Sequence, residues 1–314
     1  MDDIDRIERR LKLHDLRILI AVVAAGSMHK AAERLGMSQS AISRAIADLE
    51  QVIDARLLDR SPLGIEPTES GRALIKRGVA MFDELRQAVG VIKLLSDPSA
   101  GELRIGCSEV MAAGPVSAVI NDLTEQHSRR VFHVLTGATA TLYRALTERR
   151  IDLVIGRVAG AVMDEHEDAG GLFEDAVVVA AGAQSRWACK GKVELEELAN
   201  EPWVLPPFDT EMGAIVLEGF RARGLTPPPT TVIAGSTHMR HALAAAGRFL
   251  TVVPEFALRL PGTFAALRHV PVELPNARRT LRIITARNRS LSPLAEVFID
   301  RLRTTVLSLT TDAT

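Results

Sequence analysis

The sequence has few of the features that define secreted, membrane-bound or metal-dependent proteins. Its 314 residues include only two cysteines, Cys107 and Cys189, which is too few for a disulfide framework and provides no Cys-x-x-Cys metal pair. The longest apolar run, near Ala176 to Ala183, is far shorter than the roughly 20 residues that a membrane-spanning helix needs. No apolar signal segment precedes the first expected helix, so we expect a cytoplasmic protein without a metal, a cofactor or a membrane partner.

The sequence also lacks a charge excess and the common catalytic motifs. Its 38 basic side chains oppose 39 acidic ones, for a net charge of -1. A polyanionic partner would therefore be bound only modestly by each domain, and useful affinity would need two or more domains on one partner. A dinucleotide-binding Gly-x-Gly-x-x-Gly sequence, a phosphate-binding P-loop and a Gly-x-Ser-x-Gly nucleophile motif are all missing. We therefore expect no enzyme and no catalytic residue.

What the chain does contain is a pair of short helices in residues 28–47. Ala32 is small where two crossing helices would touch, Gly36 can adopt the turn between them, and Ile42 can hold the second helix on the first. This spacing is typical of a helix-turn-helix. The alternative is any helical hairpin that ends in a glycine turn.

The flanking sequence favours a winged helix-turn-helix over residues 1–67. Two short extended pieces surround a Pro/Gly turn within residues 56–68, which predicts a hairpin wing. Upstream, apolar residues have the spacing of a helix that would support the pair: Leu13, Leu16, Leu19, Ile20 and Val23.

The second helix of the pair begins with short polar residues that are suited to a major groove. We expect Gln39 and Ser43 to contact bases, and Ser38, Arg44 and Arg60 to contact the DNA backbone. The full set of residues expected at the DNA interface is Ser27, His29, Lys30, Ser38, Gln39, Ser40, Ser43, Arg44, Arg60 and Thr68.

A long helix is expected over residues 68–96. Thr68 with Gly71 after it has the pattern of a capped helix start. The apolar residues that follow would form a seam for pairing with a second copy of the helix, although an amphipathic helix packed on its own domain is the alternative. These residues are Leu74, Ile75, Phe82, Leu85, Val89 and Ile92. Asp97 to Gly101 would then end the helix and begin a domain of residues 97–314.

Strand-like and helix-like runs alternate from residue 102 to about 305. The alternation predicts a largely parallel sheet with helices on both faces, and about 200 residues suit two small lobes. The expected helices are 113–127 and 139–149, and the expected strands are 103–107, 131–135, 151–156, 177–179, 231–233, 249–253 and 281–284.

Ligands of such sheets bind beyond the carboxyl ends of strands, where the amino ends of helices point. Three loops meet this description, at residues 107–109, 136–139 and 235–238, and Pro206 to Phe208 would form an apolar wall in the second lobe. We expect Thr139 to cap the helix that follows it. The alternative for each serine or threonine is an ordinary helix cap without a ligand, and Cys107 is expected to be a buried strand residue rather than a thiol sensor. The candidate effector-binding residues are Ser108, Thr139, Phe208, Thr237 and His238.

The first 70 residues resemble those of LysR-type transcriptional regulators. The resemblance rests on LRILIAVVAAGSMHKAAERLGMSQSAISRAIADLE, on RLLDRSPLGIEPTESG after it, and on the order of the downstream elements. LKLHDLRIL and RSPLGIEPT are similar to the branch named for a galactose-binding-protein regulator. Ser40 departs from the proline that is usual at the start of the reading helix, and Leu63 departs from a frequent basic wing residue.

The resemblance implies a transcriptional regulator with a two-lobed, periplasmic-binding-protein-like effector domain. The chain would cross between the lobes near 175–180 and return near 280, and Ser108, Thr139 and Phe208 would line the effector cleft. The expected partners are pseudo-palindromic double-stranded promoter DNA, a small effector such as a sugar or carboxylate, and further copies of the chain in a dimer or tetramer. RNA polymerase is a candidate further partner. The alternatives are a DNA-binding protein without an effector and, with least support, a solute-binding-like enzyme.

Overall fold

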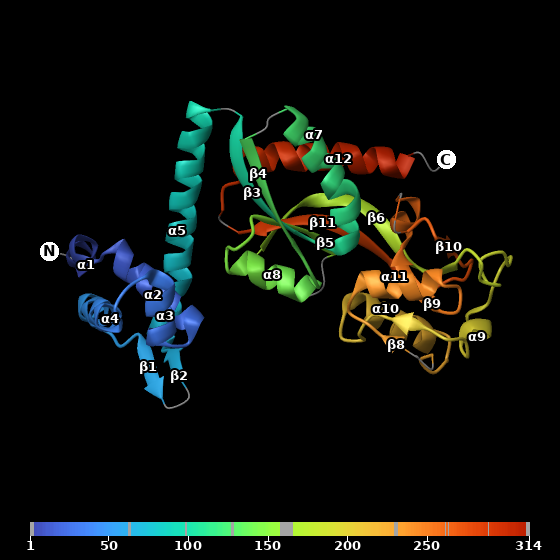
Figure 1. The fold of residues 1–314 in the computed structure, drawn as a ribbon, viewed down its shortest axis with the longest axis horizontal. Helices are drawn as coiled ribbons and strands as arrows, with labels where there is room; N and C mark the ends of the chain where they lie inside the picture. Colours follow the sequence, from blue (N-terminus) through green and yellow to red (C-terminus); the bar gives the residue numbers. More distant parts are fainter. Residues whose placement is uncertain are drawn as a thin grey trace. The chain divides into compact units, whose positions relative to one another are not determined.

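The computed structural model describes residues 3–61, 64–97, 99–126, 129–157, 166–228, 232–260, 262, 264–287 and 289–311. The chain divides into two compact units, Met1–Val89 and Gly90–Thr314. The elements of the first unit are α1 (Asp3–Arg10), α2 (Leu13–Ala25), α3 (Met28–Leu35), α4 (Gln39–Ile53), β1 (Leu58–Ser61) and β2 (Gly64–Pro67), and α5 (Glu69–Ser96) runs from it into the second (Figure 1). The sequence analysis did not anticipate α1.

Helices α2, α3 and α4 enclose the core of the first unit as the helix-turn-helix pattern predicts. Ala32 and Ile42 are buried, and Gly36 ends α3 with a φ of 64°, a left-handed conformation that glycine adopts without strain. One expected core residue is wrong, because Leu13 is 43% exposed. Ile18 is buried on α2 together with Leu16, Leu19 and Val22, so the buried stripe is rotated from the expected one.

The wing is an antiparallel hairpin in which Arg60 of β1 pairs with Ile65 of β2. Pro62 and Leu63, at its turn, lie outside the described residues. The Glu50 carboxylate, near the end of α4, accepts hydrogen bonds from the backbone N–H groups of Leu57 at 2.7 Å and Leu58 at 3.3 Å. The start of the wing is therefore tied directly to the helix that precedes it.

Helix α5 begins with the expected cap, since the Gly71 N–H donates to the Thr68 hydroxyl at 3.0 Å. Its apolar residues divide into two groups. Leu74, Ile75 and Phe82 pack against the core of the first unit, which is the alternative that the sequence left open. Leu85, Val89 and Ile92 are 51%, 43% and 61% exposed and remain available for pairing with another helix.

The second unit contains a seven-stranded sheet with the order β10-β6-β11-β5-β3-β4 and with β9 beside β6. In the part of the chain that the structure describes, the parallel pairs of this sheet are β3 with β4 and β3 with β5, whereas β6, β9, β10 and β11 pair antiparallel. The expectation of a largely parallel sheet is therefore wrong, because strands that cross between lobes return in the opposite direction. The bounds are β3 (Ala100–Cys107), β4 (Arg129–Thr136), β5 (Leu153–Arg157), β6 (His166–Gly182), β9 (Leu250–Pro254), β10 (Leu267–His269) and β11 (Arg278–Ala286).

Helices cover both faces of the sheet in the first lobe. Leu153 and Ile155 of β5 face the core beneath α7 and α12, while Val154 between them packs on the side of α8 (Figure 1). This alternation follows from the two-residue period of a strand. The helices of this lobe are α6 (Glu109–Met111), the π-helix Ala112–Val116, α7 (Ser117–Gln126), α8 (Thr139–Thr147) and α12 (Pro293–Thr311).

The second lobe has its own core around the far ends of β6 and β9. Val177 and Val179 pack with Trp203 and Phe220 on one face of β6, and Val178 packs towards α11 on the other. A short parallel pair, β7 (Val204–Leu205) with β8 (Val232–Ile233), adds a second small sheet. The remaining elements are α9 (Leu195–Leu198), α10 (Glu211–Ala222), α11 (Thr237–Ala245) and the 3-10 helix Glu255–Arg259.

The chain passes between the lobes at the two positions that the resemblance implies. Along β6, Phe173 packs against the first-lobe core and Val177 belongs to the second-lobe core. Along the return, Ala277 belongs to the second-lobe core and Leu281 to the first. One continuous sheet therefore serves both lobes.

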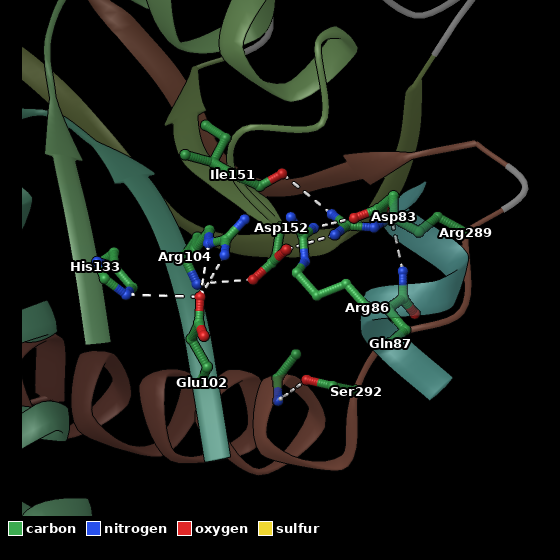
Figure 2. Close-up of polar contacts among 11 residues, drawn as sticks. Asp83, Arg86, Gln87, Glu102, Arg104, His133, Ile151, Asp152, Arg289 and Ser292 are labelled. Carbon is green, nitrogen blue, oxygen red and sulfur yellow. Dashed lines mark hydrogen bonds and ion pairs between the residues drawn. The ribbon is translucent and has the colours of Figure 1, made fainter. Parts of the chain in front are cut away.

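A buried ion pair braces the first lobe at the start of β5. Asp152 accepts the backbone N–H of Arg104 at 2.7 Å and pairs with the guanidinium of Arg289 (Figure 2). Arg289 also donates to the backbone oxygen of Ile151 at 3.1 Å. These contacts hold the segment before α12 against the residues that directly precede β5.

Gly71 provides a test of how α5 is seated on the DNA-binding unit. A Cβ atom at Gly71 would lie 2.0 Å from the backbone oxygen of Leu57, so Gly71→Ala must displace backbone and should destabilise this unit by about 3 kcal/mol. Hydrogen exchange of the α2–α4 amides measures the loss. Gly90→Ala, on the same helix with no atom within 4 Å of its Cβ position, should instead be neutral or stabilise by up to about 1 kcal/mol. Equal effects of the two substitutions would contradict this account.

Candidate DNA-binding and effector-binding sites

The amino end of α4 presents a polar face to solvent. Ser38 is its N-cap and accepts a hydrogen bond from the Ala41 N–H at 3.2 Å, and the Ser38 and Ser40 hydroxyls lie 3.0 Å apart. Gln39 and Arg44 are exposed and Ser43 is half-buried, while Ile42 is fully buried in the core. The first turn therefore combines exposed polar side chains with the positive end of the helix dipole.

The other residues expected at the DNA interface lie on α3, the wing and the start of α5. His29 and Lys30 are exposed on the first turn of α3, and Ser27 is its half-buried N-cap residue. Arg60 is exposed on β1. The Thr68 hydroxyl is already occupied, because it donates to the Arg56 backbone oxygen at 2.7 Å and accepts from the backbone that it caps.

In the first lobe of the second unit, the structure uses the two candidate hydroxyls differently. Ser108 caps α6 and accepts the Met111 N–H at 3.3 Å, as an ordinary helix cap does. The expectation that Thr139 caps α8 is wrong, because Ala138 is the N-cap and makes no side-chain cap. The Thr139 hydroxyl instead lies close enough to the carboxylate of Glu211, the first residue of α10 in the second lobe, to lower the pKa of that carboxyl.

A buried charged group lies where β6 passes between the lobes. The Arg157 guanidinium, at the end of β5, contacts Asp175 of β6 at 3.0 Å, and the two side chains are 11% and 4% exposed. The other Asp175 oxygen accepts the backbone N–H of Phe256 at 3.1 Å. Burial raises the pKa of Asp175 to about 6, and Arg157 opposes that rise. Burial also raises the pKa of Glu211, opposed by Arg157, Arg279 and Thr139.

The amino end of α11 carries a second buried cation. Ser236 caps this helix and accepts the Met239 N–H at 3.3 Å. The Arg240 side chain, whose residue is only 5% exposed, donates to the backbone oxygens of Ala234 at 2.8 Å and Gly235 at 3.1 Å and to the Thr237 hydroxyl at 3.2 Å. Burial lowers the pKa of Arg240, and the charge of Glu109 from the first lobe opposes that effect.

His241 and Phe208 occupy different environments in the second lobe. The His241 ring is buried and meets the Phe264 ring edge-on, with centroids 4.3 Å apart. Its burial, reinforced by the charges of Arg240 and His238, lowers the pKa of His241 to about 4. His238 is exposed, and Phe208 is half-buried against the second-lobe core.

These pKa effects relate residues of both lobes in two polar groups. One group is Thr139, Glu211 and Arg157, and the other relates Glu109, beside Ser108, to Arg240. The sequence analysis missed Arg157, Glu211 and Arg240. Arg157 directly follows an expected strand, and Arg240 is the only arginine or lysine of α11, so each carried a local indication.

The cysteines take no part in this arrangement. Burial raises the pKa of Cys107 to about 12, which keeps its thiol protonated and gives no support to a thiol sensor. Within the described ranges, no group of three histidine, cysteine, aspartate or glutamate side chains is placed to hold a metal. Among the same residues, no helix has both the length and the apolar character to cross a bilayer.

A winged helix-turn-helix followed by a long helix and a two-lobed α/β domain defines a DNA-binding regulator with a sensing domain. Two family models match the chain in that order: "Bacterial regulatory helix-turn-helix protein, lysR family" over residues 13–72 and "LysR substrate binding domain" over residues 96–306. The chain therefore belongs to the LysR family. It is a LysR-type DNA-binding transcriptional regulator with an effector-binding domain, and not an enzyme.

Curated relatives span most of the chain at modest identity. The transcriptional dual regulator GltC of Bacillus subtilis (strain 168) is 27% identical over 92% of this chain and 96% of its own. GbpR of Azospirillum brasilense is 25% identical over 95% and 87%, and TdcA of Escherichia coli (strain K12) is 27% identical over 77% of each chain. These similar values single out no branch of the family.

Solved structures share the fold over nearly the whole length. Full-length CbnR in complex with its target DNA has a TM-score of 0.64 at 18% identity, covering 94% of this chain and all of CbnR. A full-length OxyR variant from Pseudomonas aeruginosa has a TM-score of 0.65 at 19% identity, covering 94% of both. Regulators of this family bind DNA and form oligomers.

The low pKa of His241 predicts a defined loss of stability in acid. The unfolded histidine binds a proton near pH 6.5, whereas the folded one resists protonation until about pH 4. The contribution of His241 to the free energy of unfolding is therefore fully present above pH 6.5. It is lost as the pH falls towards 4, by up to about 3 kcal/mol.

The difference in unfolding free energy between wild type and His241→Phe, measured from pH 7 to 4, isolates this effect from that of Asp175, which is common to both. His269→Gln, at an exposed histidine, serves as the control. A difference that stays constant with pH would contradict the assignment.

Proposed function

We propose that this regulator reads a pseudo-palindromic promoter site through the amino end of α4. Gln39 and Ser43 contact base edges, and Ser38, Arg44 and Arg60 contact the backbone, with Ser27, His29, Lys30, Ser40 and Thr68 at the edge of the interface. The observation that carries the proposal is the exposed polar first turn of α4 over a fully buried Ile42. The existing capping bonds of Thr68 favour a role for it in positioning the backbone rather than in base reading.

We further propose that two copies pair through the exposed apolar residues of α5, and that dimers associate again into tetramers. Leu85, Val89 and Ile92 follow the seam spacing and are exposed, which supports pairing. Two linked DNA-binding units on one duplex would bind it more tightly than one unit, because a near-neutral chain gives each unit only modest affinity for DNA. Such a regulator works on chromosomal DNA in the cytoplasm, where RNA polymerase is its candidate partner.

The effector is proposed to bind between the two lobes, near Ser108, Thr139, Phe208, Thr237 and His238. The effect of Thr139 on the pKa of Glu211 supports this position, because it shows that the amino ends of α8 and α10, from opposite lobes, lie near one another. A ligand inserted there would contact both ends and change the angle between the lobes.

Gln39→Ala tests the DNA interface. Loss of the amide should relax preference at one or two base pairs and weaken binding to the preferred site by about tenfold, with the fold unchanged. Selection of bound sites from random duplexes measures both the specificity and the half-site spacing. Gln51→Ala removes the same side chain from an exposed position near the other end of α4 and should change neither. An unaltered preference in Gln39→Ala would refute the assignment.

Ser108→Ala tests the effector position. A sugar or carboxylate that stabilises the wild-type chain should bind the variant about tenfold more weakly, while DNA affinity without the compound stays the same. Thermal shift and DNA titration provide the two readouts. Ser292→Ala is the matched control, since Ser292 caps α12 through the Ala295 N–H at 3.2 Å and its removal should destabilise the fold by a similar amount, about 1 kcal/mol. A normal response in Ser108→Ala would place the effector elsewhere.

A further inference from the structure

The two buried cations near the lobe boundary differ in how their charge is balanced. Arg157 contacts Asp175 directly, and Glu211 lies within its electrostatic reach. Asp175 and Glu211 therefore offset the positive charge of Arg157. Arg279 lies in the same electrostatic environment, since it also lowers the pKa of Glu211. Arg240 has no such partner among the described residues, because all three acceptors of its guanidinium are neutral oxygens. Its Nε atom is buried and makes no hydrogen bond there, as is also true of the Arg157 Nε, so the difference between the two arginines is the contacting carboxylate.

A buried guanidinium that contacts no carboxylate is costly, even with Glu109 acting on it from a distance, and an ionised partner in contact removes much of that cost. Arginine stays protonated at physiological pH, so the charge cannot be relieved by deprotonation. The facing first lobe offers Glu109, but no contact within ion-pair distance joins it to Arg240 among the described residues. The Arg240 guanidinium therefore lacks a contacting negative group within the described part of the chain, and an anion from outside the chain could supply it.

The surroundings of Arg240 favour an oxyanion at this position. Its bonds to Ala234, Gly235 and Thr237 hold the guanidinium at the amino end of α11. Thr237 and His238 supply the first two backbone N–H groups of that nine-residue helix, which no helical carbonyl can accept. Donors of this kind together with the helix dipole bind carboxylate and phosphate groups.

We propose that the effector carries an oxyanion, a carboxylate or a phosphate, which binds Arg240 and the first backbone N–H groups of α11. The inference rests on the proposed effector site and narrows the class of its ligand. Arg240 anchors the anion, and Glu109 opposes it from the other lobe. Neutral sugars lack the group that this position requires.

Titrations of the full-length protein test the proposal at constant ionic strength. One arm uses succinate and citrate, a second uses inorganic phosphate and glycerol phosphate, and a third uses the neutral compounds galactose and inositol. At least one compound of the first two arms should raise the melting temperature and bind measurably by calorimetry. The arm that responds identifies carboxylate or phosphate as the source of the oxyanion.

Two substitutions then assign the binding to this position. Arg240→Met should weaken the responding anion by at least about tenfold. Because Arg240 also holds backbone oxygens, Glu109→Gln provides a second variant at an exposed side chain, and it should tighten the same anion by about threefold. Glu125→Gln, at an exposed glutamate of α7, should leave its affinity unchanged.

The outcomes separate the inference from the proposed function. Anion binding that neither Arg240→Met nor Glu109→Gln alters would overturn the assignment. A response to neutral compounds alone would overturn the oxyanion class and leave the effector site between the lobes in place. No response in any arm would count against both.

Discussion

Strand β6 contributes to both cores of the effector-binding unit, and the rest of that unit depends on this sharing. Both lobes use β6 in their part of the sheet, and the return passes from Ala277 of the second-lobe core directly into β11 of the first, so the lobes fold around common backbone rather than around a linker. The Arg157–Asp175 pair sits on the shared segment, and Asp175 also holds the backbone at Phe256. Changes in lobe angle must therefore be accommodated close to these buried charges.

Local sequence predicted those parts of the fold that are determined locally. Ala32, Gly36 and Ile42 fixed a helix-turn-helix because close packing and a left-handed turn restrict residue type at each position. Strand positions followed from apolar runs. Strand direction did not, since antiparallel pairing of β6 with β11 joins residues about a hundred positions apart. Phe82 likewise fitted a seam by its spacing, yet it packs on its own unit.

The candidate site residues likewise divide into those that local sequence predicts and those that only the folded chain reveals. Ser108 was identified because it directly follows a strand, which is a local property. Thr139 was taken for a helix cap because nothing in its neighbourhood reveals that Glu211, 72 residues later, lies close enough for the Thr139 hydroxyl to lower its pKa. Arg240 was overlooked because a single charge in an apolar helix reads as solvent-exposed. Its significance comes from burial and from neutral partners, and only the folded chain supplies these.

Glu50 couples α4 to the wing of the winged helix-turn-helix, which gives this unit a property that neither element has alone. Its carboxylate joins the first residues of the wing to the last turns of α4, so that, in the proposed mode of DNA binding, the helix in the groove and the wing beside it would keep a fixed spacing. A duplex that engages both must match a fixed separation. Operators whose groove width departs from that separation have to bend or twist to fit, and the stiffness of bases that no side chain touches then contributes to discrimination.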